Sequence, residues 1–325
     1  MTGQLNVLII GCGKIAGGFD ASQNAGTLPC THAGAFSEDT RFNIVACVDP
    51  DNITRSRFIE RWNIPWGFNT LEEALGNQLP IDIISICSPT AFHKSNLLDA
   101  LKFKPRLIFC EKPVSESSND TQLLRDACEN AGVLLAVNYT RRWDPNLVNL
   151  KQALLDGKYG KLRSVAGFYN KGILNNGSHL IDLLHYLLGD LQVIAVAEPL
   201  IDLSVNDPTV PAMLQSASGV PVHLAIGHAD DYSFFELHLI FSTGLLMMRD
   251  GGLSWVSRYP ILSERFPGYR TLGQEHFDEG GYPKAMLAAV DNIFDALSSG
   301  ASLASTGTSA LKAQITCEKI IALVN

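Results

Sequence analysis

The sequence predicts two domains: an α/β domain with a doubly wound, parallel sheet over residues 1–139, and an α+β domain with an open, mostly antiparallel sheet backed by helices over residues 140–325. Three observations predict this division. The 325 residues are too many for one ordinary core. Short apolar runs alternate with helical stretches up to residue 139, which is typical of parallel strands joined by crossover helices. Beyond residue 190, strand-like runs follow one another without helices between them, which is typical of antiparallel pairing.

The first strand and the turn after it have the pattern of a dinucleotide-binding unit. Leu5–Ile10 is a short apolar run with little alternation, as expected of a strand buried on both faces. The motif that follows it is Gly11-x-Gly13-Lys14-Ile15-Ala16. The first glycine permits a tight turn, the second lets backbone approach a pyrophosphate, and the small Ala16 lets the next helix pack closely. We therefore expect a Rossmann-type phosphate site here, although an ordinary strand–turn–helix can produce the same string.

The second strand, within residues 42–48, ends in Asp49. A carboxylate at this position can accept both ribose hydroxyls of an adenosine and repels a 2′-phosphate. No arginine follows until Arg55, so we expect NAD in preference to NADP. The separation from the glycines exceeds the usual ~20 residues, which the loop-like stretch Phe19–Cys30 explains. The alternative is that Asp49 is only an acidic turn residue before Pro50.

The next strand, Ile81–Cys87, is followed by Ser88, Pro89 and Thr90, and then by His93. Because ligands collect at the carboxyl ends of parallel strands, we expect these residues to face the cofactor. His93 is equally well an ordinary surface residue at the start of a helix.

Leu107–Cys110 leads into Glu111-Lys112-Pro113, the strongest single indication of chemistry. Proline fixes the backbone and disfavours helix at Lys112. A lysine here, beside a bound nicotinamide, can hydrogen-bond a substrate hydroxyl and stabilise the alkoxide that precedes hydride departure. Partial burial would lower the pKa of its ammonium group. The alternative is a surface Glu–Lys pair before a turn.

Arg141 and Arg142 follow Leu134–Asn138, the last strand expected in the first domain. Paired arginines near a cleft indicate a carboxylate or phosphate partner. Solvated charge at a domain junction is an equally good interpretation.

In the second domain, a loop broken by glycines at residues 172–177 runs into an apolar helix. This places His179 in the first turn, where an imidazole can act as a general acid or base at neutral pH. Asp182 and His185 follow at steps of three residues, each of which turns the side chain by ~300°, so we expect no metal site. Further strands are expected within 162–169, 193–196, 220–227, 234–241 and 245–249, and helices within 146–155, 180–188, 282–297 and 309–323.

Composition excludes several classes of function. The formal charge of −8, with no basic block, argues against a nucleic-acid partner. No apolar run reaches the ~18 residues that cross a bilayer. The seven cysteines are scattered without a Cys-x-x-Cys pair, so we expect neither a disulfide framework nor a zinc site. Without a signal-peptide pattern, the protein is expected to be cytoplasmic.

Taken together, these motifs resemble those of the glucose-fructose oxidoreductase/inositol dehydrogenase/MocA (Gfo/Idh/MocA) family, in the family's order and over the whole chain in outline. The matching stretches are residues 11–16, 48–49, 88–93, 111–113, 138–143 and 177–182. The resemblance implies that Lys112 is the catalytic lysine and His179 its acid/base partner. It places Ser88, Thr90, His93, Glu111 and Arg142 around the cofactor. It also implies a homodimer or homotetramer whose contact lies on the open sheet.

One departure from the family pattern concerns Asn175, which stands where family members commonly have an aspartate, four residues before the histidine. An amide cannot take a proton as a carboxylate can. Proton transfer would then fall on His179 and Lys112, with Asn175 binding substrate, or the redox step could use Tyr169 or be lost. Lys171, where glycine is frequent in the family, and Arg141 indicate an anionic substrate such as a nucleotide-linked sugar or a sugar acid.

The expected activity is therefore NAD(P)-dependent hydride transfer with a secondary alcohol or ketone of a sugar, nucleotide sugar or cyclitol. Two alternatives stay open. One is an NAD-dependent glycoside hydrolase of the same fold, and the other is a cofactor-binding protein that has lost redox activity.

Overall fold

The computed structural model describes residues 3–22 and 26–324. The chain forms two compact units, Met1–Trp143 with Pro283–Leu311, and Asp144–Tyr282 with Lys312–Asn325. This division differs from the expected single cut between residues 139 and 140, because residues 283–311 return to the first unit. The helix expected within 282–297 as a closing element of the second domain lies in this returning segment.

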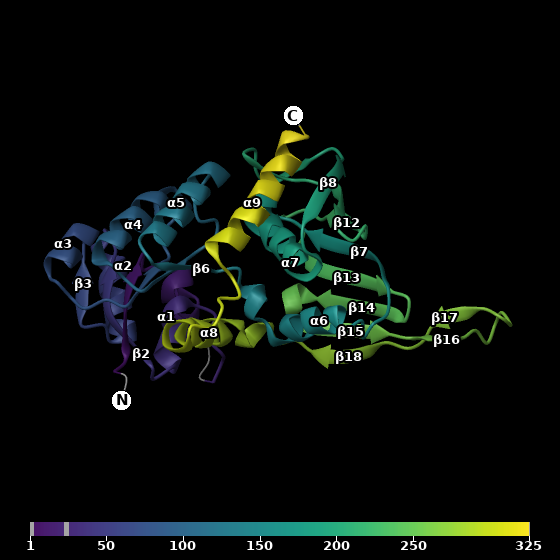
Figure 1. Ribbon diagram of the computed structural model, residues 1–325, viewed down its shortest axis with the longest axis horizontal. Helices are drawn as coiled ribbons and strands as arrows, with labels where there is room; N and C mark the ends of the chain where they lie inside the picture. Colours follow the sequence, from purple (N-terminus) through teal and green to yellow (C-terminus); the bar gives the residue numbers. More distant parts are fainter. Residues whose placement is uncertain (1–2, 23–25, 325) are drawn as a thin grey trace. The chain divides into compact units, whose positions relative to one another are not determined.

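A six-stranded parallel sheet in the order β3-β2-β1-β4-β5-β6 forms the centre of the first unit (Figure 1). Ile10 at the end of β1 pairs with Val48 of β2 on one side and with Ile86 of β4 on the other. The predicted doubly wound sheet is confirmed, and its order reverses between β1 and β4, where ligands bind in such sheets. The strands are β1 (Leu5–Ile10), β2 (Phe42–Val48), β3 (Trp66–Phe68), β4 (Ile83–Ile86), β5 (Leu107–Cys110) and β6 (Leu134–Val137).

Helices of the first unit begin where side-chain oxygens satisfy backbone N–H groups, as helix N-termini require. Thr31, Asp51, Thr70 and Ser117 each accept an N–H from the first turn of the helix that follows. Val7 and Ile9 of β1 share one buried cluster with residues of α1 and α8. The helices are α1 (His32–Glu38), α2 (Asn52–Trp62), α3 (Leu71–Gly76), α4 (His93–Ala100), α5 (Ser118–Asn130) and α8 (Ala285–Ser299).

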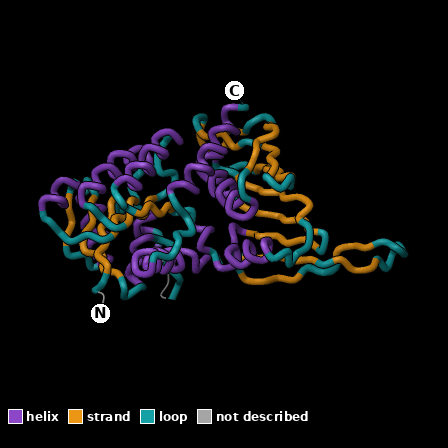
Figure 2. Tube along the Cα trace, viewed as in Figure 1, coloured by secondary structure: helices purple, strands orange, loops and turns teal. Residues whose placement is uncertain are grey.

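The second unit holds an eight-stranded sheet in the order β18-β15-β14-β13-β7-β12-β11-β8 (Figure 2). All neighbouring strands are antiparallel except β12 and β7, so the mostly antiparallel sheet is confirmed. Its strands are β7 (Leu162–Tyr169), β8 (Leu191–Val196), β11 (Ala212–Ser216), β12 (Pro221–Ile226), β13 (Phe235–Phe241), β14 (Gly244–Arg249), β15 (Ser254–Arg258) and β18 (His276–Glu279). Two hairpins stand apart, β9 (Leu200–Ser204) with β10 (Asp207–Thr209), and β16 (Pro260–Leu262) with β17 (Arg270–Leu272).

One face of this sheet is covered by helix and the other is open. A Cβ added at Gly167 of β7 would lie 2.7 Å from Leu180, so glycine lets α7 approach the sheet closely. On the other face Met213, Ile240 and Phe277 are exposed. The helices of this part of the chain are α6 (Pro145–Leu155), α7 (Ser178–Leu188) and α9 (Gly307–Ala322), the last of which begins in the first unit.

Candidate functional site

The glycine turn after β1 is closed toward the sheet and open on its other side. Gly11 has φ +84°, and a Cβ there would lie 2.7 Å from the backbone nitrogen of Ser88. A Cβ at Gly13 would meet nothing within 4 Å. Only glycine fits at Gly11, whereas Gly13 leaves room for a group to approach the backbone. This geometry fits a pyrophosphate over the turn, as the sequence predicts.

The segment after the turn is not the regular α-helix expected there. Residues Lys14–Gly18 form one π-helical turn, and α1 begins only at His32. Ala16 is fully buried, and a Cβ at Gly17 would lie 2.3 Å from the indole nitrogen of Trp62. The small residues thus serve close packing against α2 as well as the turn. Part of the predicted Phe19–Cys30 loop, residues 23–25, lies outside the described residues.

Asp49 is attached to the glycine turn. Its Oδ2 accepts a hydrogen bond from the Cys12 backbone N–H at 2.8 Å, and its Oδ1 accepts one from the Asp51 N–H at 2.9 Å. The Arg55 guanidinium donates to the Asp49 carbonyl oxygen and to the Asn52 side chain. The Asp49 carboxylate therefore lies beside the glycine turn. The Arg55 guanidinium lies at the same strand end, which the sequence spacing did not predict.

The loop after β4 is held by His93, whose ring is 1% exposed. Its Nδ1 lies 2.8 Å from the Pro113 carbonyl oxygen and its Nε2 lies 2.7 Å from the Ser88 carbonyl oxygen. The prediction that His93 faces the cofactor is wrong, because both ring nitrogens are engaged by backbone and the ring is buried. His93 instead joins the ends of β4 and β5. Ser88, whose Oγ accepts from Asn96, is half-buried, as is Thr90, while Pro89 is exposed.

Lys112 is half-buried and follows Glu111, at the end of β5. The carboxylate of Glu111 lies 2.9 Å from Nε2 of His32 and accepts from Nδ2 of Asn138 at 2.6 Å. Its Oε2 accepts from the Lys112 backbone N–H at 3.3 Å. His32 is not among the site residues predicted from the sequence. The pairing joins residues 79 positions apart, so no local pattern could reveal it.

The contact between His32 and Glu111 favours the charged form of both side chains. Burial alone would lower the pKa of His32, but the neighbouring Cys87 thiol and the Glu111 carboxylate raise it to about 10. Burial likewise opposes the charge on Glu111, yet the hydrogen bond from His32 and the charges of His32 and Lys112 hold the pKa of Glu111 below its usual value.

The paired arginines lie in a single 3-10 turn, Thr140–Trp143, with 8% of Arg141 and 7% of Arg142 exposed. Nη1 of Arg142 donates to the Ala304 carbonyl oxygen at 3.3 Å. The interpretation as solvated charge at a junction is therefore wrong. Their predicted roles, Arg142 toward the cofactor and Arg141 toward the substrate, stay predictions.

In the second unit, carboxylates of the β9–β10 hairpin hold the loop that carries Asn175. Asp202 accepts the N–H of Lys171 at 2.8 Å, and Asp207 accepts the N–H groups of Leu174 at 2.7 Å and Asn175 at 2.9 Å. The loop is thereby fixed ahead of α7. It leaves Asn175 exposed and His179 half-buried in the first turn of that helix.

Tyr169 does not serve as a substrate contact. It is fully buried, and its hydroxyl donates to the carbonyl oxygen of Val210 and accepts from the N–H of the same residue, both at 2.8 Å. Burial raises the pKa of this phenol. The predictions that Tyr169 binds substrate or takes over the redox step are wrong, because the side chain belongs to the core between β7 and residue 210.

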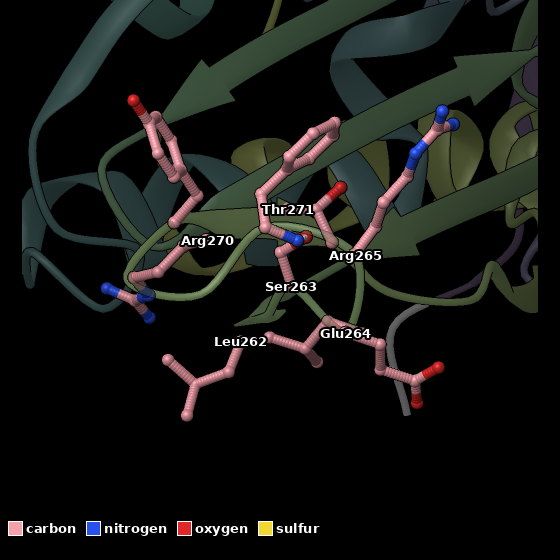
Figure 3. A pocket seen from close by; sticks show the side chains of 9 residues that line it. Leu262, Ser263, Glu264, Arg265, Arg270 and Thr271 are labelled. Atoms are coloured by element: carbon pink, nitrogen blue, oxygen red, sulfur yellow. Dashed lines mark hydrogen bonds between the residues drawn. The ribbon is translucent and has the colours of Figure 1, made fainter.

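A hollow of about 810 Å³ lies at the tip of the β16–β17 hairpin (Figure 3). The charged ends of Glu264 and Arg265 point away from each other there, so these two charges do not converge on one ligand. Among the described residues, no three His, Cys, Asp or Glu side chains are placed to hold a metal ion. Within the same described ranges, no helix combines the length and apolarity needed to span a membrane.

The chain is similar to known oxidoreductases. The model of an oxidoreductase family with an NAD-binding Rossmann fold, GFO_IDH_MocA, matches residues 5–139. Inositol 2-dehydrogenase of Rhizobium meliloti (strain 1021) is 23% identical over 311 residues, which cover 89% of this chain and 91% of that protein.

Two solved structures show the same fold over nearly the whole chain. An oxidoreductase from Agrobacterium radiobacter in complex with NAD+, L-tartaric acid and magnesium has a TM-score of 0.77 at 18% identity, covering 99% of this chain and 96% of that one. A dehydrogenase from Bordetella pertussis in complex with NADH and UDP-GlcNAcA has a TM-score of 0.75 at 17% identity, with the same coverage, 99% and 96%.

Proposed function

The chain belongs to the Gfo/Idh/MocA family of NAD-binding oxidoreductases, and we propose that it moves a hydride between NAD and a secondary alcohol or ketone of a sugar, nucleotide sugar or cyclitol. The observation that carries this proposal is an arrangement within the first unit. The open glycine turn, the Asp49 carboxylate and Lys112 follow the carboxyl ends of β1, β2 and β5 of one parallel sheet.

The residues of the first unit fit a dinucleotide. The backbone at Gly11 and Gly13 would hold the pyrophosphate, and Asp49 would accept the adenosine ribose hydroxyls. Ser88, Pro89 and Thr90 would line the path from the turn toward the end of β5. When bound, the nicotinamide ring supplies the hydride chemistry.

Lys112 and His179 are the acid/base groups of the proposed reaction. The Lys112 ammonium group would donate a hydrogen bond to the reacting oxygen and take up or release its proton as the hydride moves. His179 would be the second proton carrier, since Asn175 cannot accept a proton. Asn175 would donate to or accept from a substrate hydroxyl.

Lys171 supports an anionic substituent on the substrate. It is half-buried at the start of the loop that carries Asn175, and its backbone is fixed in the left-handed region at φ +64°. A cation carried by this fixed loop would favour a sugar acid or a nucleotide-linked sugar. Arg141 is buried, so it would bind the substrate only if an anionic group of the substrate reached its guanidinium.

A homodimer or homotetramer is the proposed assembly, formed through the open face of the eight-stranded sheet. The register places Phe277, Val256, Met247, His238, Ala166, His223 and Met213 in one row across this face. Phe277 and Met213, toward its two ends, are exposed, whereas Val256 and Met247 are buried. Exposed apolar side chains toward both ends of the row suit a contact between copies. Light scattering should report a mass above that of one chain, and Met213→Glu should lower it.

The test of the proposed function is a binding titration followed by a substrate panel. The protein is titrated with NAD and NADP in both redox states and is then given sugars, cyclitols and nucleotide sugars while nicotinamide absorbance is followed. Tighter binding of NAD and a change in absorbance with at least one substrate are expected. Binding without turnover across the panel would indicate lost redox chemistry, and release of a sugar without net NADH would indicate a hydrolase.

A further inference from the structure

A short chain of hydrogen bonds leads from the core of the first unit to Lys112. Nδ1 of His32 lies 2.8 Å from Oγ of Ser85, and Nε2 lies 2.9 Å from Oε1 of Glu111. The other oxygen of Glu111 accepts from the Lys112 backbone N–H at 3.3 Å. The contacts therefore tie α1, β4 and the end of β5 to the residue that carries the proposed chemistry.

The contacts of His32 can hold a charged imidazole. The His32 side chain is 0% exposed and that of Glu111 is 12% exposed, so a lone carboxylate here would be costly without a cation beside it. With both ring nitrogens protonated, Nε2–H donates to Glu111 and Nδ1–H donates to Ser85. The Ser85 hydroxyl can then donate to Sγ of Cys87, 3.5 Å away. Both ring N–H groups of His32 have an acceptor in this state.

The charge of Lys112 also lowers the pKa of Glu111, whose carboxylate accepts the Lys112 backbone N–H. A carboxylate next to an ammonium group favours the charged ammonium and thus opposes proton release. A cation on the far side of the carboxylate offsets this effect. The order along the contact is cation, anion, cation: His32, Glu111, Lys112.

We propose that His32 is a positioning residue for Lys112: it fixes the Glu111 side chain and offsets the negative charge beside the Lys112 ammonium group, so that Lys112 can exchange its proton near neutral pH. The role in turnover rests on the proposed function, whereas the effect on Lys112 does not.

Side chains from three neighbouring strand ends lie around His32. They are Ser85 and Cys87 from β4 and its end, the ring of Phe109 on β5 with Glu111 after it, and Asn138 after β6. Asp20 accepts the N–H of Thr31, the residue before His32. Of these, Glu111 is the charged group that contacts both His32 and the Lys112 backbone, so the coupling should run through it.

The test measures Lys112 itself, without needing turnover. The full-length protein is labelled with trace acetic anhydride over a range of pH, and acetylation of the peptide that contains Lys112 is measured by mass spectrometry. In His32→Gln the midpoint of labelling should rise by about one pH unit, the size expected for one unit charge removed nearby. In the Glu111→Gln background, adding His32→Gln should not raise it.

Two further measurements keep the test decisive. Phe36→Leu, on the same helix and packed edge-on against Phe109, should lower the melting temperature and leave the midpoint in place. Where His32→Gln fails to fold, NMR of the wild-type imidazole nitrogens decides: His32 should be doubly protonated at neutral pH. A neutral His32 at pH 7, or the same midpoint with and without His32, would overturn the proposal. Failure of the sugar panel would instead overturn the proposed function alone.

Discussion

The Asp49 carboxylate accepts a hydrogen bond from the backbone N–H of Cys12 at 2.8 Å, which joins the end of β2 to the glycine turn after β1. A carboxylate oxygen has two acceptor positions, so one lone pair on Oδ2 remains for a ligand. The side chain is thus held in place where an adenosine ribose would arrive in a Rossmann fold. Arg55 lies at the same strand end.

This contact predicts how the choice between dinucleotides responds to Asp49→Ser. NAD affinity should fall about tenfold, or ~1.4 kcal/mol, because the ribose acceptors are lost. NADP affinity should rise, because the repulsion of a 2′-phosphate disappears while Arg55 remains. Fluorescence titration measures both. Asp51→Asn is the matched control, since asparagine still caps α2; an unchanged NAD/NADP ratio in Asp49→Ser would rule out the assigned role.

Gly11 and Gly13 should respond differently to alanine. Gly11→Ala places a Cβ against the Ser88 backbone at φ +84° and should destabilise the fold by about 1–3 kcal/mol while abolishing NAD binding. Gly13→Ala meets no protein atom, so the melting temperature should hardly change while NAD affinity falls. Thermal unfolding and titration separate the two effects. Wild-type NAD affinity in Gly13→Ala would show that the backbone is not approached there.

Tyr169→Phe tests the structural role assigned to that phenol. Losing a hydroxyl that bonds twice to Val210 should cost about 1–2 kcal/mol of unfolding free energy, because two backbone groups become unsatisfied. The kcat on any substrate of the wild type should stay within about twofold, since the ring is fully buried. Urea unfolding measures the loss of unfolding free energy, and steady-state kinetics measure kcat. A large fall in kcat at unchanged stability would return Tyr169 to the active site.

The His32–Glu111 pair predicts the pH dependence of stability. The pKa of His32 is raised to about 10, so its contribution is complete below about 6.5, the unfolded value, and is lost as pH rises toward 10. The pKa of Glu111 is lowered, so its contribution is present above about 4.5 and is lost as pH falls below that value.

The free energy of unfolding from urea titrations should therefore decline between pH 7 and 9.5, by no more than about 1.4 kcal/mol per pH unit from this one group. The double variant His32→Gln/Glu111→Gln should decline less over the same range. Equal declines in the two proteins would mean that His32 does not carry the titration.

The sequence was sufficient for the parallel sheet because β1, β2, β4 and β5 are local apolar runs that end in recognisable turns. It was sufficient for the glycine turn because the Gly11-x-Gly13 spacing directly after an apolar strand is a local pattern, although the close approach of the Ser88 backbone to Gly11 is not. Other features depend on contacts between distant residues. Tyr169 bonds to Val210 and His32 to Glu111, and no periodicity shows such pairs.

The same reason explains the misplaced residues. His93 follows a strand end, as a ligand-facing residue does, yet two backbone carbonyls engage its ring. Residues 283–311 follow the second unit in the chain but pack with the first, because the apolar stripe of α8 (Met286, Val290, Ile293) completes the cluster beneath β1. Hydrophobic patterning predicts that a helix is buried, but not against which sheet.

The most direct test of the role proposed for Lys112 is Lys112→Ala, with the exposed Lys102→Ala as control. Once a substrate is found, we predict that Lys112→Ala lowers the rate of nicotinamide reduction or oxidation by about 10²–10⁴-fold, the usual share of a general acid/base group. Its Kd for NAD should stay within about threefold of wild type, and Lys102→Ala should match wild type in both measurements. Near-normal turnover in Lys112→Ala would contradict an acid/base role for this lysine.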